Sequence, residues 1–261
     1  MSSDKRAKSH PYNFYAGTSG LQLPVKNKLF YPEEFQDKSR LCYYGFLMNS
    51  IEINSSFYKI PRTATVARWA SEVPDGFKFT FKLAKDITHC KDLLFDRDVV
   101  SQFFEVINGV EEKKGCLLVQ FPPSTRIGQV RQLSLLIEAL RASDPENRWK
   151  IAFEFRHVSL YHKDIYQMLE EHRMAMVIHD KTPAATPMLE SDLPFVYLRF
   201  HGSEGSYRGS YEDDVLSEYA TYVNEWLSEG KEVFTYFNNT MGEALPNLFT
   251  LKKFVLEKGE D

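Results

Sequence analysis

The sequence predicts a single α/β domain of the closed (β/α)8, TIM-type barrel class. Segments in which apolar and polar residues alternate with period two, as in strands, take turns along the chain with segments of helical periodicity. This unit repeats about eight times at intervals of roughly 20 to 40 residues, which indicates a parallel sheet. The chain has 261 residues, a length that suits eight such units closed into a barrel. A doubly wound open sheet is the alternative, but no Gly-x-Gly-x-x-Gly motif follows the first strand. We assign residues 1–11 to a disordered polar tail and 12–261 to the barrel.

The strands are marked by their alternation. In Phe-Lys-Phe-Thr-Phe-Lys at 77–82 all the Phe residues share one face. In Ile-Ala-Phe-Glu-Phe-Arg-His at 151–157, Glu154 and Arg156 share the face opposite to Phe153 and Phe155. Burying such charges unpaired would be costly, so they need partners, a ligand or water. We expect strands at 12–19, 50–54, 77–82, 116–121, 151–157, 174–180, 195–201 and 231–238.

The helices are marked by apolar residues three or four positions apart, as in Val130, Leu133, Ile137 and Leu140. Ser210 is the expected N-cap of the helix after the seventh strand. Three prolines lie between residues 180 and 195, so the crossover after the sixth strand is expected to be irregular and free of helix. We expect helices at 33–46, 63–72, 99–112, 130–140, around 165–169, 215–226 and 243–257.

The composition of the chain limits which binding partners and which cellular compartment we expect. The net charge of -4 argues against a generally nucleic-acid-binding or polybasic membrane surface, although a local basic patch keeps nucleic acid among the candidate partners. No signal peptide and no apolar run long enough to span a membrane is visible, so we expect a cytoplasmic protein with no membrane partner. Three widely spaced cysteines without a Cys-x-x-Cys pair argue against a zinc ribbon or a redox motif. Oligomeric state is not indicated by the sequence.

Polar and charged side chains stand at the end of nearly every predicted strand. Active sites of barrels of this class lie at the carboxyl ends of the strands, so we expect these side chains to form a ligand-binding rim. The catalytic candidates are Glu154, His201, Glu52 and Asp180. The substrate-binding candidates are Lys82, Arg156, Arg199, Asn54, Gln120, Tyr207, Tyr211, Asn238, Asn239 and His89.

A structural alternative exists for the same rim. Its acids and bases would pair with one another and simply fill the barrel mouth, as structural ion-pair networks do. Such networks are often replaceable by apolar residues without loss of stability, which makes stability a weak reason for having one. Acids facing Arg and Lys also suit an anionic substrate handled by acid–base chemistry. Phosphate or carboxylate is the expected anion, because Arg binds both in a bidentate manner.

A metal site is the less favoured reading of the rim. No His-Glu-x-x-His-type spacing occurs, and His179, of opposite parity to Asp180, is expected to face the helices. A Mg²⁺ or Mn²⁺ ion held by Glu52, Glu154 and Asp180 is the form such a site would take, since those ions prefer oxygen ligands. We assign no cofactor with this reasoning.

The Gly-rich segment 201–211 is a second candidate anion site. Its glycines at 202, 205 and 209 allow close backbone approach, and a helix is expected just after it. Loops after strands seven and eight often bind phosphate in barrels of this class, and helix N-termini attract anions. The alternative is an ordinary flexible loop. Tyr207 and Tyr211 would then cover the barrel mouth, whereas in a binding loop they would stack on a base or sugar.

Seven short motifs follow one another along the chain, at 17–20, 52–58, 87–89, 120–123, 154–157, 199–202 and 236–239. Together and in this order they resemble the YecE-like family, a widespread bacterial domain-of-unknown-function family. The resemblance runs from about residue 15 to 248, and it implies a TIM-type barrel but no particular reaction. Leu21 and Leu160 stand where the family pattern usually has Trp, and Thr240 where Asp is common, which leaves the substrate more open than the fold.

Three functions compete. The first is a hydrolase-type enzyme acting on a phosphate-containing or other anionic substrate, with Glu154 as base or metal ligand and His201 as acid. The second is a non-catalytic module that binds a small anion or a nucleic-acid end in the same pocket. The third is a carbohydrate-active barrel in which Glu52 and Glu154 form a carboxylate pair roughly 5 to 9.5 Å apart.

Overall fold

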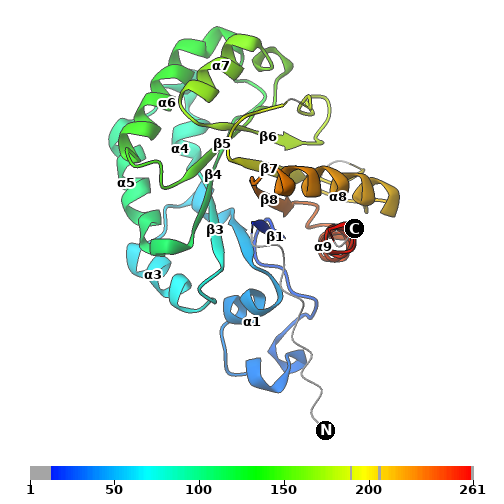
Figure 1. Cartoon of the computed structure of the whole chain (residues 1–261). Helices are drawn as coiled ribbons and strands as arrows, with labels where there is room; N and C mark the ends of the chain where they lie inside the picture. The colour runs from blue at the N-terminus through cyan, green and yellow to red at the C-terminus, as the bar shows by residue number, and fades with distance from the viewer. Residues whose placement is uncertain (1–12, 189, 205–206, 260–261) are drawn as a thin grey trace.

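The alternating segments of the sequence form eight parallel strands within residues 13–188, 190–204 and 207–259, which the structure, a computed structural model, describes. The strands lie at the centre of the molecule with helices around them (Figure 1), and neighbouring strands follow the order β1-β8-β7-β6-β5-β4-β3-β2. The predicted barrel class is confirmed. The predicted tail at residues 1–11 lies outside the described residues. The strands are β1 (Phe14–Thr18), β2 (Ser50–Ile53), β3 (Lys78–Lys82), β4 (Lys114–Gln120), β5 (Lys150–Glu154), β6 (Ala175–His179), β7 (Phe195–Phe200) and β8 (Glu232–Phe237).

The helices form the outer ring of the barrel (Figure 1). No helix in the described part of the chain is long and apolar enough to cross a membrane. The helices are α1 (Arg40–Leu47), α2 (Ser55–Tyr58), α3 (Thr63–Ser71), α4 (Lys85–Thr88), α5 (Arg97–Ile107), α6 (Val130–Ser143), α7 (Lys163–Glu171), α8 (Asp213–Ser228) and α9 (Ala244–Lys258).

Two helices are shorter than the sequence pattern suggested. The segment expected at 33–46 is a 3₁₀ turn at Glu33–Phe35, and the α-helix begins only after Ser39, whose Oγ accepts a hydrogen bond from the Cys42 N–H. The segment expected at 99–112 is α5 followed by a 3₁₀ stretch, Asn108–Lys113. The Ser39 cap therefore starts the first helix later than the apolar pattern suggested, and α5 gives way to a 3₁₀ stretch after Ile107.

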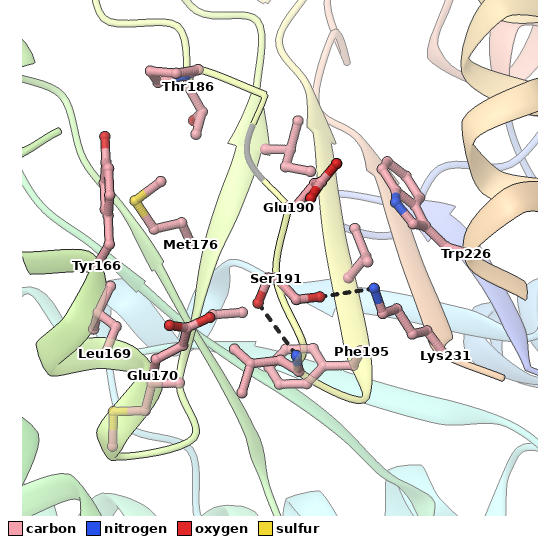
Figure 2. Close-up of a pocket in the computed structure, with 16 residues that line it drawn as sticks. Tyr166, Leu169, Glu170, Met176, Thr186, Glu190, Ser191, Phe195, Trp226 and Lys231 are labelled. Carbon is pink, nitrogen blue, oxygen red and sulfur yellow. Dashed lines mark hydrogen bonds between the residues drawn. The ribbon is translucent and has the colours of Figure 1, made fainter. Parts of the chain in front are cut away.

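The crossover between β6 and β7 contains no helix in its described residues, as expected from its prolines. It leaves a hollow of about 180 Å³ on the outer face of these two strands, between α7 and α8. Figure 2 shows Met176, Trp226 and Lys231 around this hollow, where the Lys231 Nζ donates to the Ser191 carbonyl oxygen at 2.8 Å. The hollow lies behind the strands, and none of the predicted site residues lines it.

Side chains on the two faces of the strands form two separate cores. The outward faces carry the large aromatics that pack under the helices, such as Phe121, whose ring stacks on Phe153 at 5.7 Å and Phe155 at 5.6 Å. The lumen is filled by smaller side chains and by tyrosines, including Ala152 and Tyr236. Period-two alternation thus separates a helix-facing core from a lumen core, and the upper end of the lumen core becomes the site.

Side chains complete the junction between β1 and β2, where the two strands share an isolated bridge between Ser19 and Glu52. The Tyr44 hydroxyl of α1 accepts from the Thr18 N–H at 2.8 Å and donates to the Ser50 carbonyl oxygen at 3.1 Å. Gly17 is required here, because a Cβ on it would stand 2.0 Å from the Ser50 carbonyl oxygen. The Tyr44 hydroxyl therefore supplies hydrogen bonds to backbone groups of β1 and β2 that these strands do not make with each other.

Replacing Tyr44 by Phe should lower the free energy of unfolding by about 1 to 3 kcal/mol, because the buried Thr18 N–H and Ser50 carbonyl lose their partner. Tyr43→Phe is the control, since the Tyr43 hydroxyl makes no hydrogen bond with any residue of the described ranges; its effect should stay within about 0.5 kcal/mol. Urea titrations of both variants measure the difference. Equal losses in the two variants would show that the Tyr44 hydroxyl does not stabilise the junction.

Candidate functional site

Arg199 of β7 lies at the centre of a buried ion cluster at the carboxyl ends of the strands. Its Nε and Nη2 donate to the Glu52 carboxylate of β2 at 2.9 to 3.2 Å, and its Nη1 donates to Glu154 of β5 at 3.0 and 3.3 Å. The Arg199 side chain is 2% exposed, and both carboxylates are fully buried. The planar guanidinium thus joins three strands that are not neighbours in the sheet.

Both carboxylate oxygens of Glu52 accept hydrogen bonds from several donors. Besides Arg199, the Ser19 Oγ donates to Glu52 Oε1 at 2.6 Å, and the Tyr197 hydroxyl donates to Oε2. Tyr197 precedes Arg199 by two residues on the same lumen face, so its parity alone would have placed it in the site. A carboxylate with this many donors has no free oxygen for a substrate. The geometry does not favour Glu52 as an acid or base.

Glu154 is held in its charged form by the surrounding cations. It accepts hydrogen bonds from Arg199 and forms an ion pair with Arg156, and His201 Nε2 lies 3.5 Å from its Oε2. Burial acts to raise the pKa of Glu154, but the charges of Arg199 and Arg156 outweigh it and hold that pKa well below the ordinary value. A carboxylate with such a low pKa is a weak base, which disfavours the role that we expected for it.

His201, just beyond β7, is a neutral imidazole. Its Nε2 lies 3.1 Å from Arg156 Nη2 and 3.3 Å from Arg199 Nη1, and since a guanidinium only donates, Nε2 accepts. Burial, against the opposing effect of Glu154, lowers the pKa of His201 to about 3. Nδ1 then carries the single proton of the neutral ring and lies 3.1 Å from the side-chain amide of Asn238, whose oxygen is the atom able to accept it. A neutral His201 holds no proton on Nε2 to donate at neutral pH, so the geometry does not favour it as a general acid.

Lys82 closes the cluster at the end of β3. Its Nζ lies 4.1 Å from the centre of the Phe57 ring and makes no hydrogen bond or ion pair with a residue in the described ranges. Burial and the charge of Arg199 lower the pKa of Lys82 to about 8. His89 packs edge-on against the same Phe57 at 4.9 Å, and burial and the charge of Lys82 lower the pKa of His89 to about 4. Phe57, in the short α2, gave no signal of this role in the sequence.

Asp180 lies apart from the ion cluster. Its carboxylate accepts from the His201 backbone N–H at 2.8 Å and from the Tyr211 hydroxyl, and burial raises its pKa. It therefore anchors the loop after β7. The expectation that His179 faces the helices is wrong: it continues the lumen face of Ala175 and Val177, its Nε2 lies 2.9 Å from the Phe155 carbonyl oxygen, and its ring lies 5.7 Å from that of His201.

The Gly-rich loop after β7 packs against its own chain. A Cβ on Gly202 would stand 2.0 Å from the Arg208 carbonyl oxygen, and the Gly202 N–H already donates to the Tyr211 hydroxyl at 2.6 Å. The expected N-cap Ser210 is wrong, because α8 is preceded by Glu212. Acidic residues at 213 and 214 fill the first turn of α8, which disfavours an anion there. Gly205 lies outside the described residues.

The remaining predicted binders divide by position. Tyr207 lies at the mouth, with its ring 5.9 Å from that of His201 and the Lys181 Nζ 4.7 Å above it. Asn239 binds the Gly209 carbonyl oxygen and Asn247, so it holds the loop. Gln120 donates to the adjacent Phe121 carbonyl oxygen. Asn54 lines a separate hollow of about 240 Å³ between the end of β2 and α3.

The three carboxylates weighed as metal ligands do not converge on one point. Glu52 and Glu154 both face Arg199, whereas Asp180 faces Tyr211. Across 13–188, 190–204 and 207–259, no group of three or more His, Cys, Asp or Glu side chains is placed to hold a metal ion. We therefore build no metal-assisted step on these residues.

Replacing Arg199 by Met should lower the free energy of unfolding by about 3 to 5 kcal/mol, because two buried carboxylates lose their shared cation. The matched control is Arg148→Met, which removes a 2.8 Å pair with Glu112 whose side chains are 45% and 90% exposed; its cost should not exceed about 1 kcal/mol. Chemical denaturation compares the two. Similar small losses would mean that the cluster does not stabilise the fold.

His201 should make stability pH-dependent. Its pKa is lowered in the folded protein from 6.5 to about 3, so between these values the unfolded chain binds a proton that the folded chain does not. The free energy of unfolding should therefore fall as pH decreases through this window. In His201→Gln the decrease should be shallower, as measured by urea titrations at several pH values. Identical slopes would contradict a neutral, buried His201.

Comparison with known proteins agrees with the architecture. The profile of the family described as "Protein of unknown function DUF72" matches residues 15–260. The UPF0759 protein YecE of Escherichia coli is 24% identical over 155 residues, which cover 57% of this chain and only about half (55%) of that protein. The UPF0759 protein YunF of Bacillus subtilis is 23% identical over 253 residues, covering 81% of this chain and 84% of YunF.

A solved structure shows the same barrel. The crystal structure of a DUF72 family protein from Thermotoga maritima superposes with a TM-score of 0.75 at 27% sequence identity, covering 93% of this chain and 99% of that one. Both the fold and nearly the whole length of the chain are thus shared with this group. The chain therefore belongs to the DUF72 family, and it is similar to the UPF0759 proteins YecE and YunF, as the YecE-like motifs in its sequence predicted.

Proposed function

We propose that this protein is an enzyme that acts on a phosphate-containing or other anionic substrate at the carboxyl-terminal face of its barrel. The observation that carries the proposal is an imbalance of charge at the mouth. Three cations, Lys82, Arg156 and Arg199, face two carboxylates, Glu52 and Glu154. Lys82 has no acceptor in the described part of the chain. An anionic group on a substrate would balance the cluster.

Arg156 offers a further donor. Its side chain is 8% exposed, and its Nη2 binds Glu154, but its Nε–H is buried and has no partner among the described residues. A buried, unpaired N–H of a guanidinium is costly, so an acceptor that reaches it is favoured. Phosphate and carboxylate groups accept from a guanidinium in a bidentate manner, which makes them the expected ligands.

The reaction would need a side chain that can act as a base near neutral pH. A hydrolase-type reaction needs a base that takes a proton from water. Glu154 and His201 are weak bases, because their pKa values are lowered well below the ordinary values. Lys82, with a pKa of about 8, is neutral in a useful fraction of molecules and is only partly buried, so we assign it the role of base in such a reaction.

Two other functions are less well supported. In a carbohydrate-active barrel Glu52 and Glu154 would face the glycosidic bond, but both are fully buried and are bound to one guanidinium. A non-catalytic module would bind a small anion or a nucleic-acid end through the same cations. Recovery of a stabilising phosphate ester unchanged after long incubation would support the module; release of phosphate would support the enzyme.

Inorganic phosphate should raise the Tm of the wild-type protein. At a hundredfold excess over Kd the stabilisation is about 2.7 kcal/mol, which corresponds to a rise of roughly 5 to 10 °C for a chain of this length. Lys82→Met should lose most of this rise, whereas Lys85→Met, an exposed lysine three residues further on, should keep it.

Potassium chloride of equal ionic strength serves as the salt control. If the phosphate-induced rise is the same in Lys82→Met as in the wild type, or is matched by chloride, the mouth is not the anion site.

A further inference from the structure

We propose that Lys82 is a nucleophile that captures the carbonyl group of an anionic substrate as an imine. The inference rests on the proposed anion site and deepens it. It names the substrate class as an aldehyde or ketone that also bears a phosphate or carboxylate group. In this reaction the Lys82 amine attacks the substrate itself, in place of a water molecule.

The first support is the placement of the Lys82 amine. Lys82 ends β3 on the lumen side, and its Nζ rests on the face of Phe57 at 4.1 Å with no acceptor in the described residues. Lysines that bind a carboxylate are fixed as ammonium ions. Lys82 is partly exposed at the mouth, and its nitrogen is not among the fully buried unpaired atoms of the described residues, so a ligand could reach it.

The second support is the charge around this amine. The charged and titratable groups that face Lys82 are Glu52, Glu154, Arg156, Arg199 and His89. The two carboxylates, which are bound by the guanidiniums, act to raise the pKa of Lys82, but burial and the charge of Arg199 outweigh them. Burial and Arg199 together lower the pKa of Lys82 to about 8. At pH 7 this raises the neutral amine fraction roughly 300-fold over that of an ordinary lysine.

Lys252 shows that burial of a lysine alone does not make such a site. Burial also lowers its pKa to about 8, but it lies on α9, away from the strand ends. Its Nζ donates to the Leu47 carbonyl oxygen at 3.3 Å and lies 3.9 Å from the Met48 sulfur. Lys252 therefore has a structural partner, whereas Lys82 combines a lowered pKa with an open nitrogen among cations.

The proposed step needs no oxidant or reductant. The Lys82 nitrogen bonds to the carbonyl carbon, and one of its protons passes to the carbonyl oxygen, which gives a carbinolamine. The carbon–oxygen bond then breaks, and the hydroxyl leaves as water with the second proton of the nitrogen, which gives the imine. Arg156 would hold the anionic group of the substrate during both steps.

Pyridoxal 5′-phosphate is the probe, because it carries an aldehyde and a phosphate on one small molecule. The full-length protein is incubated with less than one equivalent, reduced with borohydride, digested and mapped by mass spectrometry. We expect the reduced adduct on Lys82 at least about tenfold faster than on Lys85. The rate should rise with pH around an apparent pKa of about 8. Inorganic phosphate should slow it, and pyridoxal, which lacks the phosphate, should react more slowly.

Lys82→Arg is the matched variant, since it keeps the positive charge but forms no imine. It should retain the rise in Tm with phosphate and lose the adduct at this position. Lys85→Arg should change neither result. A circular-dichroism spectrum that matches the wild type shows that each variant is folded.

The outcomes separate the two proposals. If phosphate raises the Tm but Lys82 is labelled no faster than Lys85, the imine inference is overturned and the anion site stands. If Lys82 reacts equally with pyridoxal and is not protected by phosphate, the anion site is overturned, and with it the proposed substrate class. Absence of both effects overturns both.

Discussion

The guanidinium of Arg199 is the constraint on which the barrel mouth depends. It binds the carboxylates of Glu52 and Glu154, which come from two strands that are not neighbours in the sheet. The layer of the lumen at the carboxyl ends of the strands is therefore an ion cluster, whereas the layers below it consist of apolar and hydroxyl-bearing side chains. Desolvation makes each member costly without its partners, which keeps the cluster closed as a unit. Glu52 and Glu154, the residues that look most chemical in the sequence, are thereby committed to holding Arg199 in place.

This arrangement leaves the chemistry to groups that the cluster does not neutralise. Arg156 and Arg199 surround His201 and Lys82 with positive charge, which favours the uncharged form of the imidazole and of the amine. In this site the guanidiniums are fixed cations, the carboxylates are already bound to them, and part of the Lys82 amine is uncharged. Such a site is suited to an anion that carries an electrophilic carbon. In the proposed reaction the acids would act indirectly, by holding the cations in place around Lys82 and the anionic substrate.

Much of this architecture could be read from the sequence. Alternation and short apolar runs predicted all the strands, and the parity of Glu154 and Arg199 placed them on the lumen face, because period two is fixed by the backbone itself. Alternation within β6 also places His179 on the lumen face. We predicted the opposite because we compared it with Asp180, which lies beyond the end of β6. The partners of each charge were not predictable, since they depend on strand order and side-chain reach across the lumen. Phe57 was missed for a similar reason: it reaches Lys82 from an irregular segment without periodicity.

The helix-free crossover has a consequence for how motion is distributed in the barrel. The strands β6 and β7 have the hollow of Figure 2 behind part of their outer surface, where other strands rest on helices. Fewer apolar contacts mean a lower free energy of local opening, so amide hydrogens here should exchange sooner than those of β3 or β4. These same two strands carry His179 and Arg199, and His201 follows directly. Arg199, the shared cation of the ion cluster, therefore lies on a strand that has this hollow behind part of its outer surface.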